Sequence, residues 1–391
     1  MTIYQKDFAV QPISDAEIAD AIAAAVAQVR RNLPEFTYRQ QNHSSVANFY
    51  PAIDNDQWTC GFWPGEIWLA YELTGDKVFQ HAAQIQVQSF LHRIENKIEV
   101  DHHDMGFLYS PTCVAAWKLV GDEDGRKAAI LAADQLIARF HEVGGFIQAW
   151  GAMGARENYR YIIDCLLNLP LLYWASRETD DGKYRDIARI HAATTLANSF
   201  REDGSTYHTF FMDPETGGPV KGVTVQGYRD DSDWARGQAW SVYGLALSYR
   251  YDPKPEYAAM FRKALDFFMT RLPADMVPYW DMIFSDGDDE PRDSSSAAIV
   301  ACGLLEMADI LGGAEAAAYR DIARRFVKSL ADNYAVKDPA VSNGLVLHGT
   351  YSKKTPYNTC TPEGVDECVS WGDYYYLEAL TRLSRNWSSY W

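Results

Sequence analysis

Apolar residues recur at intervals of three and four along most of the chain, the spacing that places them on one face of an α-helix. The first such segment begins at Ser14, where Glu17 completes a capping box, and we expect Pro34 to end it. Similar segments span residues 64–74, 77–97, 107–120, 125–141, 161–178, 183–200, 235–250, 256–271, 294–311, 315–333 and 373–385. Sustained strand alternation is absent, so the pattern predicts an all-α protein of twelve helices.

The predicted helices fall into two alternating classes. The hexapeptide Tyr-Arg-Asp-Ile-Ala-Arg occurs at 184–189 and again at 319–324, early in two amphipathic segments, which indicates an internal repeat. The alternate segments, such as 113–121 and 297–312, are apolar on all sides and should lie inside. Six inner and six outer helices closing on themselves form an (α/α)6 barrel. We therefore expect residues 1–391 to fold as one barrel domain.

Composition and charge narrow the class of ligand. The formal net charge of −17 argues against a nucleic-acid or anionic-membrane partner, because the chain lacks a broad basic face. Neither a signal-like N-terminus nor an apolar run of about 20 residues is present, so we expect a soluble, cytoplasmic protein. The six cysteines form no CxxC pair, which favours buried free thiols and no metal or other cofactor. The sequence does not specify the oligomeric state.

Aromatic residues stand beside polar ones in the segments that precede the inner helices. The chain has 12 Trp and 24 Tyr, and an aromatic face offers a flat apolar surface to the C–H side of a sugar. Most of these rings should belong to the core. The exceptions adjoin polar motif residues and are candidates for sugar contact: Trp58, Trp150, Trp234 and Trp240.

Asp164 is the main candidate for catalysis. It lies between Ile163 and Cys165, apolar surroundings that should raise its pKa towards the range of a general acid. Asp104 would supply a second carboxylate. An aspartate at a helix start is more often an N-cap, but capping alone would not explain an aspartate inside an apolar run. Although His103 precedes Asp104, a third ligand of suitable spacing is not evident, so we expect no metal.

With these residues identified, the chain resembles the bacterial unsaturated glucuronyl hydrolases of glycoside hydrolase family 88. The resemblance rests on short motifs from Trp58 to the C-terminus: His103-Asp104-x-Gly-Phe, Ile163-Asp164-x-x-x-Asn168, Tyr207-His208, Gln226-Gly-Tyr, Trp234-x-Arg236-Gly-Gln-x-Trp240 and Trp371-Gly-Asp373. It implies the (α/α)6 barrel, with Asp164 as general acid and base and Asp104 as the second essential carboxylate. The implied substrate-binding residues are Trp58, His103, Trp150, His208, Gln226, Trp234, Arg236 and Trp240.

The resemblance also implies an unusual reaction on small glycosaminoglycan-type oligosaccharides that end in an unsaturated uronate. A proton is delivered to C4 of the C4=C5 enol ether, water adds at C5, and the resulting hemiketal opens and expels the remaining sugar. A neutral carboxylic acid suits the first step, and its ionised form can then activate water. One aspartate can therefore serve both proton transfers.

Two cationic candidates have alternative roles. Arg236 suits a substrate carboxylate because a guanidinium can bind it with two hydrogen bonds, but it could instead pair with Asp230, Asp231 or Asp233. Sulfate-preferring relatives carry Ser-x-x-Ser-x-Lys near the C-terminus, where this chain differs. Ser352 and Lys354 could meet a sulfate or a second sugar there, although lysines on a loop are more often simply solvated.

Three alternatives remain open at this point. An unsaturated rhamnogalacturonyl hydrolase would share the fold and mechanism but take pectic fragments. Sugar epimerases and isomerases use similar barrels, but their proton transfers usually rely on histidine, which fits Asp164 less well. A carbohydrate-binding protein without catalysis is the third.

Overall fold

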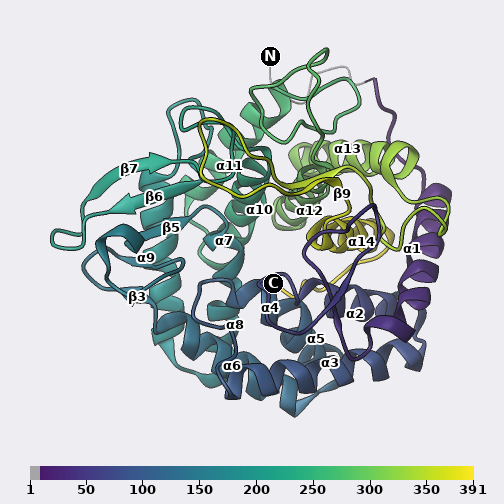
Figure 1. The fold of residues 1–391 in the computed structure, drawn as a ribbon, viewed down its shortest axis with the longest axis horizontal. Coiled ribbons are helices and arrows are strands. Elements are labelled where there is room, and N and C mark those ends of the chain that lie inside the picture. Colours follow the sequence, from purple (N-terminus) through teal and green to yellow (C-terminus); the bar gives the residue numbers. More distant parts are fainter. Residues whose placement is uncertain (1–8) are drawn as a thin grey trace.

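The computed structural model describes residues 9–391 and is an (α/α)6 barrel in which two concentric rings of helices surround one centre (Figure 1). The inner ring consists of α2 (Phe62–Thr74), α4 and α5 (Met105–Tyr109 and Ala115–Val120), α7 and α8 (Cys165–Asn168 and Pro170–Thr179), α10 (Ala235–Tyr251), α12 (Ser294–Ile310) and α14 (Ser370–Ser384). The outer ring consists of α1 (Asp15–Phe36), α3 (Lys77–Glu95), α6 (Glu123–Ile137), α9 (Gly182–Asn198), α11 (Pro255–Thr270) and α13 (Gly313–Ser329). Buried side chains of both rings form one hydrophobic cluster.

The ring closes because the first helix packs beside the last. Helix α1 contacts both α14 and α2, and α14 also contacts α2, which joins the two ends of the chain (Figure 1). The repeated hexapeptide lies on α9 and α13, both in the outer ring, as predicted. Within the described residues, no helix is long and apolar enough to cross a bilayer. Residues 1–8, part of the segment used to argue against a signal sequence, lie outside the described range.

Three helix predictions need correction. Pro34 does not end the first helix, which continues to Phe36. A proline in the last turn removes one amide donor, and the carbonyl affected belongs to Arg30, which is exposed to water. The segment 107–120 is interrupted by a π-helical turn over Ser110–Val114.

The third correction concerns 161–178, which begins as a strand rather than as a helix, because its first residues pair with a neighbouring strand. Strand β5 (Arg160–Ile162) pairs antiparallel with β6 (Thr209–Met212), which pairs with β7 (Pro219–Val223). Other short pairs lie in the connections: β1 (Gln40–Gln41) with β2 (Ala52–Ile53), β3 (Phe140–His141) with β4 (Phe146–Ile147), and β8 (Gly349–Ser352) with β9 (Glu363–Glu367).

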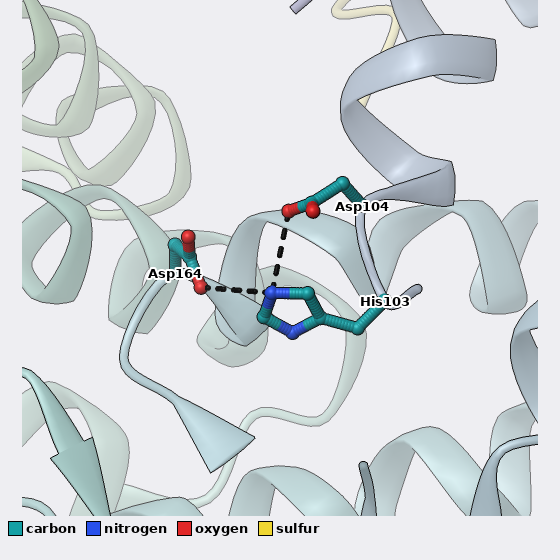
Figure 2. Close-up of side chains that lie close together, drawn as sticks. All are labelled: His103, Asp104 and Asp164. Atoms are coloured by element: carbon teal, nitrogen blue, oxygen red, sulfur yellow. Dashed lines mark ion pairs between the residues drawn. The ribbon is translucent and has the colours of Figure 1, made fainter. Parts of the chain in front are cut away.

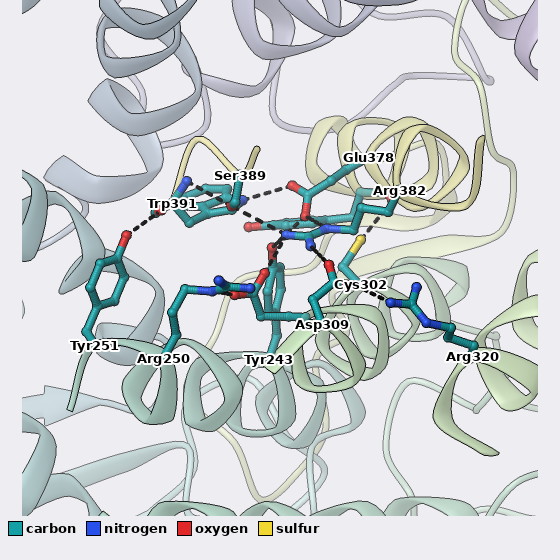
Figure 3. Close-up of polar contacts among 12 residues, drawn as sticks. Tyr243, Arg250, Tyr251, Cys302, Asp309, Arg320, Glu378, Arg382, Ser389 and Trp391 are labelled. Atoms are coloured by element: carbon teal, nitrogen blue, oxygen red, sulfur yellow. Dashed lines mark hydrogen bonds and ion pairs between the residues drawn. The ribbon is translucent and has the colours of Figure 1, made fainter. Parts of the chain in front are cut away.

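A buried polar network closes the barrel at the C-terminal ends of the inner helices (Figure 3). The Arg382 guanidinium, 2% exposed, lies 2.9 Å from Glu306 Oε2 and 2.9 Å from Glu378 Oε1. Glu378 also accepts hydrogen bonds from the Tyr243 hydroxyl at 2.5 Å and the Trp391 indole at 2.8 Å. The C-terminal segment is thereby fixed across the base of the barrel, and the end at which the inner helices begin stays free for a site.

Replacing Arg382 with Gln should destabilise the protein. The change leaves the carboxylate of Glu378 buried without a cation and leaves Glu306 with Arg250 alone, a loss of about 3 kcal/mol in the free energy of unfolding. Urea titration measures it. Arg185→Gln is the matched control, because this arginine pairs with Asp186 on the surface, and it should change the free energy by less than about 1 kcal/mol. Equal effects of the two changes would contradict the role assigned to the buried network.

Candidate active site

A pocket of about 180 Å³ lies where the inner helices begin. Ten of the candidate residues line it: Trp58, Asp104, Trp150, Asp164, His208, Gln226, Trp234, Arg236, Trp240 and Ser352. The other lining residues come from the connecting strands and loops: Arg160, Ile162, Val225, Tyr351, Cys360, Thr361 and Glu363. This lining brings together, at one end of the barrel, segments that are far apart in the sequence.

Gly106 and Asn168 hold the two aspartate-bearing segments together. A Cβ atom at Gly106 would lie 2.4 Å from the Cα of Asn168, so the two backbones approach more closely than any side chain would allow. The Asn168 amide oxygen accepts a hydrogen bond from the Phe107 amide at 2.9 Å, and its Nδ2 donates to the Asp164 carbonyl at 3.4 Å. Backbone packing therefore accounts for Gly106 and Asn168 in the motifs, without any contact with a ligand.

Main-chain hydrogen bonds connect the remaining segments. The His103 amide donates to the Ala149 carbonyl at 3.0 Å, and the Ala149 amide donates to the Arg160 carbonyl at 2.9 Å. The Ile163 amide in turn donates to the His208 carbonyl at 3.1 Å. The pocket walls are therefore joined through backbone, which limits how far they can move apart.

Asp104 and Asp164 both approach one edge of the His103 ring (Figure 2). The His103 Nε2 atom lies 3.3 Å from Asp104 Oδ1 and 3.5 Å from Asp164 Oδ1. Asp104 Oδ2 also lies 3.1 Å from His102 Nδ1. Both aspartates occupy N-cap positions, of α4 and α7, yet neither side chain makes a capping hydrogen bond. The carboxylates are therefore free for another role.

The two carboxyl groups have pKa values shifted in opposite directions. Burial raises the pKa of Asp164 well above its usual value, and the negative charge of Asp104 raises it further. Burial acts on Asp104 too, but its interactions with His103, His102 and Trp150 outweigh it and leave the pKa of Asp104 below its usual value. Such a pair provides one protonated acid next to one ionised carboxylate.

His103 itself is neutral. Burial lowers its pKa to about 4, despite the neighbouring Asp104 charge. Its ring is 1% exposed and lies behind the two aspartates instead of in the pocket wall. The arrangement suits a residue that orients the carboxyl pair.

His103, Asp104 and Asp164 together form a group of three possible metal ligands, which the sequence did not reveal. One atom each of His103, Asp104 and Asp164 lies within 4.8 Å of the others, so Asp164 supplies the third potential metal ligand that was not evident from spacing. The spacing argument against a metal therefore no longer holds, and the absence of a metal stays a prediction.

Aromatic rings form much of the pocket wall, including all four tryptophans for which contact with a sugar is predicted. Trp58 stacks on Trp371 with ring centroids 5.4 Å apart, and its indole N–H donates to the Tyr351 hydroxyl at 3.2 Å. Trp150 is 43% exposed at the mouth, whereas Trp234 and Trp240 are buried. Such rings offer flat apolar faces to a sugar.

His208 and Gln226 contribute the neutral polar groups. The His208 Nε2 lies 3.4 Å from the Gln226 amide oxygen, and its Nδ1 lies 2.6 Å from the Thr209 hydroxyl. Burial lowers the pKa of His208 to about 3, so the ring is neutral at neutral pH and can hydrogen bond to hydroxyl groups.

Arg236 makes none of the three ion pairs considered from the sequence. Its Nη1 donates to the Thr350 carbonyl at 2.6 Å, and its Nη2 donates to the Tyr351 carbonyl at 2.8 Å. The nearest carboxylate is Asp293, 3.9 Å from Nη1. The guanidinium lies 4.3 Å from the centre of the Trp234 ring and is 1% exposed. Burial lowers its pKa to about 10, so it is charged at neutral pH.

Not every candidate lines the pocket, and some lining residues were missed. Ser352 does line it, but its hydroxyl donates to the Thr361 carbonyl at 2.5 Å. Lys354 is not in the wall, and its ammonium donates to the Asn358 carbonyl at 2.6 Å. Arg160 and Glu363 were missed. If residues 160–162 are read as a strand, Arg160 and Ile162 face the same side just before Asp164. That alternation is the signal that could have indicated Arg160.

A protonated and an ionised carboxyl group in an aromatic pocket, at the mouth of an (α/α)6 barrel, define a carbohydrate-active enzyme. Residues 32–377 match the model of Glycosyl Hydrolase Family 88. The chain is 47% identical to the unsaturated chondroitin disaccharide hydrolase of Streptococcus pyogenes serotype M1 over 97% of this chain and 94% of that relative. It therefore belongs to glycosyl hydrolase family 88 and is a glycoside hydrolase.

Solved structures agree with this assignment. The crystal structure of unsaturated glucuronyl hydrolase from Streptococcus agalactiae matches with a TM-score of 0.93 and 44% identity, over 97% of this chain and 95% of that one. A mutant of that enzyme complexed with dGlcA-GalNAc6S matches with a TM-score of 0.86 and 40% identity, over 98% and 95% of the two chains. Membership of this family decides against the epimerase and the non-catalytic binding protein considered from the sequence.

The pH dependence of turnover should report the opposed pKa shifts. Replacing Asp104 with Asn removes the charge that helps raise the pKa of Asp164, so Asp164 loses its proton at a lower pH. If activity requires protonated Asp164, the alkaline limb of the kcat/KM profile of this variant moves to lower pH, in addition to any loss of rate. Asp54→Asn, at a side chain that is 84% exposed, is the control and should leave the profile unchanged. An alkaline limb that stays in place or moves to higher pH in Asp104→Asn contradicts this coupling.

Proposed function

We propose that this chain releases the unsaturated 4-deoxy-hex-4-enuronate from the non-reducing end of small glycosaminoglycan-type oligosaccharides, with residues 1–391 as one catalytic domain. The observation that carries the proposal is the coupled pair of Asp104 and Asp164 with opposed pKa shifts. The relatives named above support it, since they are described as acting on or binding unsaturated uronate disaccharides. They favour this substrate over pectic fragments.

Asp164 acts as general acid and then as general base. Its neutral carboxyl group donates a proton to C4 of the enol ether, and positive charge develops at C5 and the ring oxygen. The resulting carboxylate takes a proton from the water that adds at C5, which restores the acid. The hemiketal then opens and the remaining sugar leaves. Asp104 stays ionised and stabilises the developing positive charge while keeping the pKa of Asp164 high.

The pocket wall also bears on sulfation. Glu363, at the start of β9, lines the pocket with a side chain that is 49% exposed. Its nearest basic group is His43 Nε2 at 3.4 Å, but burial lowers the pKa of His43, so the imidazole does not neutralise the carboxylate at neutral pH. We propose that the neighbouring sugar lies beside Glu363, where a sulfate on it would meet this negative charge, while the Lys354 ammonium lies outside the wall. We propose a preference for unsulfated substrates.

The reaction itself predicts an isotope signature and a requirement for unsaturation. In D2O, the enzyme should abolish the conjugated ultraviolet absorbance of unsaturated hyaluronan or chondroitin disaccharides and place one deuterium at C4, detected by NMR or mass spectrometry. Asp164→Asn should fold normally and lose at least about 10³-fold in kcat. Asp181→Asn, at a surface N-cap, is the matched control. Cleavage of saturated uronides at an equal rate would rule out the enol-ether mechanism.

The sulfation proposal predicts a gain of function. Replacing Glu363 with Lys should raise kcat/KM about tenfold for disaccharides with sulfate on the neighbouring sugar relative to unsulfated ones, because repulsion becomes attraction at a partly screened site. Glu142→Lys adds the same charge on the exposed surface outside the pocket wall and should not change the ratio. A wild-type preference for sulfated substrates, or equal ratios in both variants, would contradict the role of Glu363.

A further inference from the structure

Arg160 is a cation of the pocket wall with no function in the scheme above. It is the first residue of β5, four positions before Asp164, and it lines the pocket together with Ile162. Alternate residues of a strand project from the same face, so the geometry of β5 turns Arg160 and Ile162 to the pocket while Tyr161 is buried behind them.

The guanidinium of Arg160 has unused donors. Its Nη1 donates to the Glu157 carbonyl at 2.7 Å and to Asn158 Oδ1 at 3.3 Å. Among residues 9–391, neither its Nε nor its Nη2 has a hydrogen-bond acceptor, and no carboxylate pairs with it. Nε and Nη2 form one edge of the guanidinium, the geometry that binds a carboxylate through two parallel hydrogen bonds.

Arg236 is held more tightly by the protein than Arg160 is. Its terminal nitrogens each donate to a main-chain carbonyl, of Thr350 and Tyr351, and its side chain is 1% exposed between aromatic rings. Its Nε is buried without an acceptor, so Arg236 also keeps donors that a substrate could use. Its two main-chain bonds fix strand β8 against the pocket, whereas the hydrogen bonds of Arg160 stay within three residues of its own position in the chain.

Electrostatics point in the same direction. The chain carries a formal net charge of −17, and the pocket wall contains the carboxyl groups of Asp104 and Glu363. The Arg160 charge is partly desolvated without a protein counter-ion and lies close enough to His103 and His208 to lower the pKa values of both. A substrate carboxylate would supply the missing partner, and a partly buried ion pair of this kind is worth more than a surface one.

We propose that Arg160 is a specificity-determining residue that binds the carboxylate of the unsaturated uronate through its Nε and Nη2 atoms. The inference rests on the proposed function, because it requires that uronate as substrate. It assigns the two parallel hydrogen bonds to the carboxylate to Arg160, while the main-chain bonds of Arg236 to Thr350 and Tyr351 position the wall.

The test compares an unsaturated uronyl disaccharide with its carboxyl methyl ester, which keeps the enol ether and removes the charge. Arg160→Gln should raise KM for the acid about 10- to 100-fold, the effect of losing a charge-assisted contact, with a smaller change in kcat. KM for the ester should stay nearly constant, so the preference of the wild type for the acid collapses. Arg160→Lys keeps the charge and should restore part of that preference.

Arg156→Gln is the matched control. This arginine lies four residues earlier, is 60% exposed and pairs with Asp213 and Glu215 outside the pocket wall, so both KM values should stay at wild-type levels. Circular dichroism checks that each variant folds, and if Arg160→Gln does not, the acid-to-ester ratio of Arg160→Lys decides alone. Comparing the acid-to-ester ratio of a variant with that of the wild type cancels any difference in intrinsic reactivity between the acid and the ester.

Two outcomes would overturn the proposal. Equal losses on acid and ester in Arg160→Gln would indicate a structural role, and an unchanged acid preference would place the carboxylate elsewhere. A wild-type enzyme that does not act on the acid would instead refute the proposed function. The two failures are therefore distinguishable.

Discussion

The proposed reaction depends on a carboxyl group that is buried beside an ionised one. Removing Asp164 from water disfavours its charged form, and the negative charge of Asp104 disfavours it further. Asp104 stays ionised because His102, His103 and Trp150 offset its own burial. The protein thereby maintains an acid and a base side by side with the same residue type, through surroundings alone.

The barrel supplies the precision that this pair requires. A coupling between two carboxyl groups changes steeply with their separation, so the segments that carry them must be fixed. Gly106 and Asn168 fix them by direct backbone contact. The network around Arg382 and Glu378 joins the opposite ends of three inner helices, α10, α12 and α14 (Figure 3).

An acidic protein that takes an anionic substrate must concentrate its cations where they act. Most arginines of this chain form ion pairs with surface carboxylates, whereas Arg160 and Arg236 lie in the pocket wall. Their contacts differ because Arg160 begins the edge strand β5, whereas Arg236 lies in the first turn of the buried helix α10. Glu363 gives the opposite charge on another part of the wall, so charges of both signs line the same pocket.

The helical period and the repeated hexapeptide determined the ring of twelve helical segments, because each amphipathic face must be buried against a neighbour. The apolar run around Asp164 was likewise enough to predict the direction of its pKa shift. The sequence did not predict the strand at Arg160, because that strand exists through pairing with β6, almost fifty residues away. It also left Arg236 undecided between several partners. Those assignments depend on which groups the folded chain brings within hydrogen-bonding distance, and distances of a few ångströms between remote segments are fixed by tertiary packing alone.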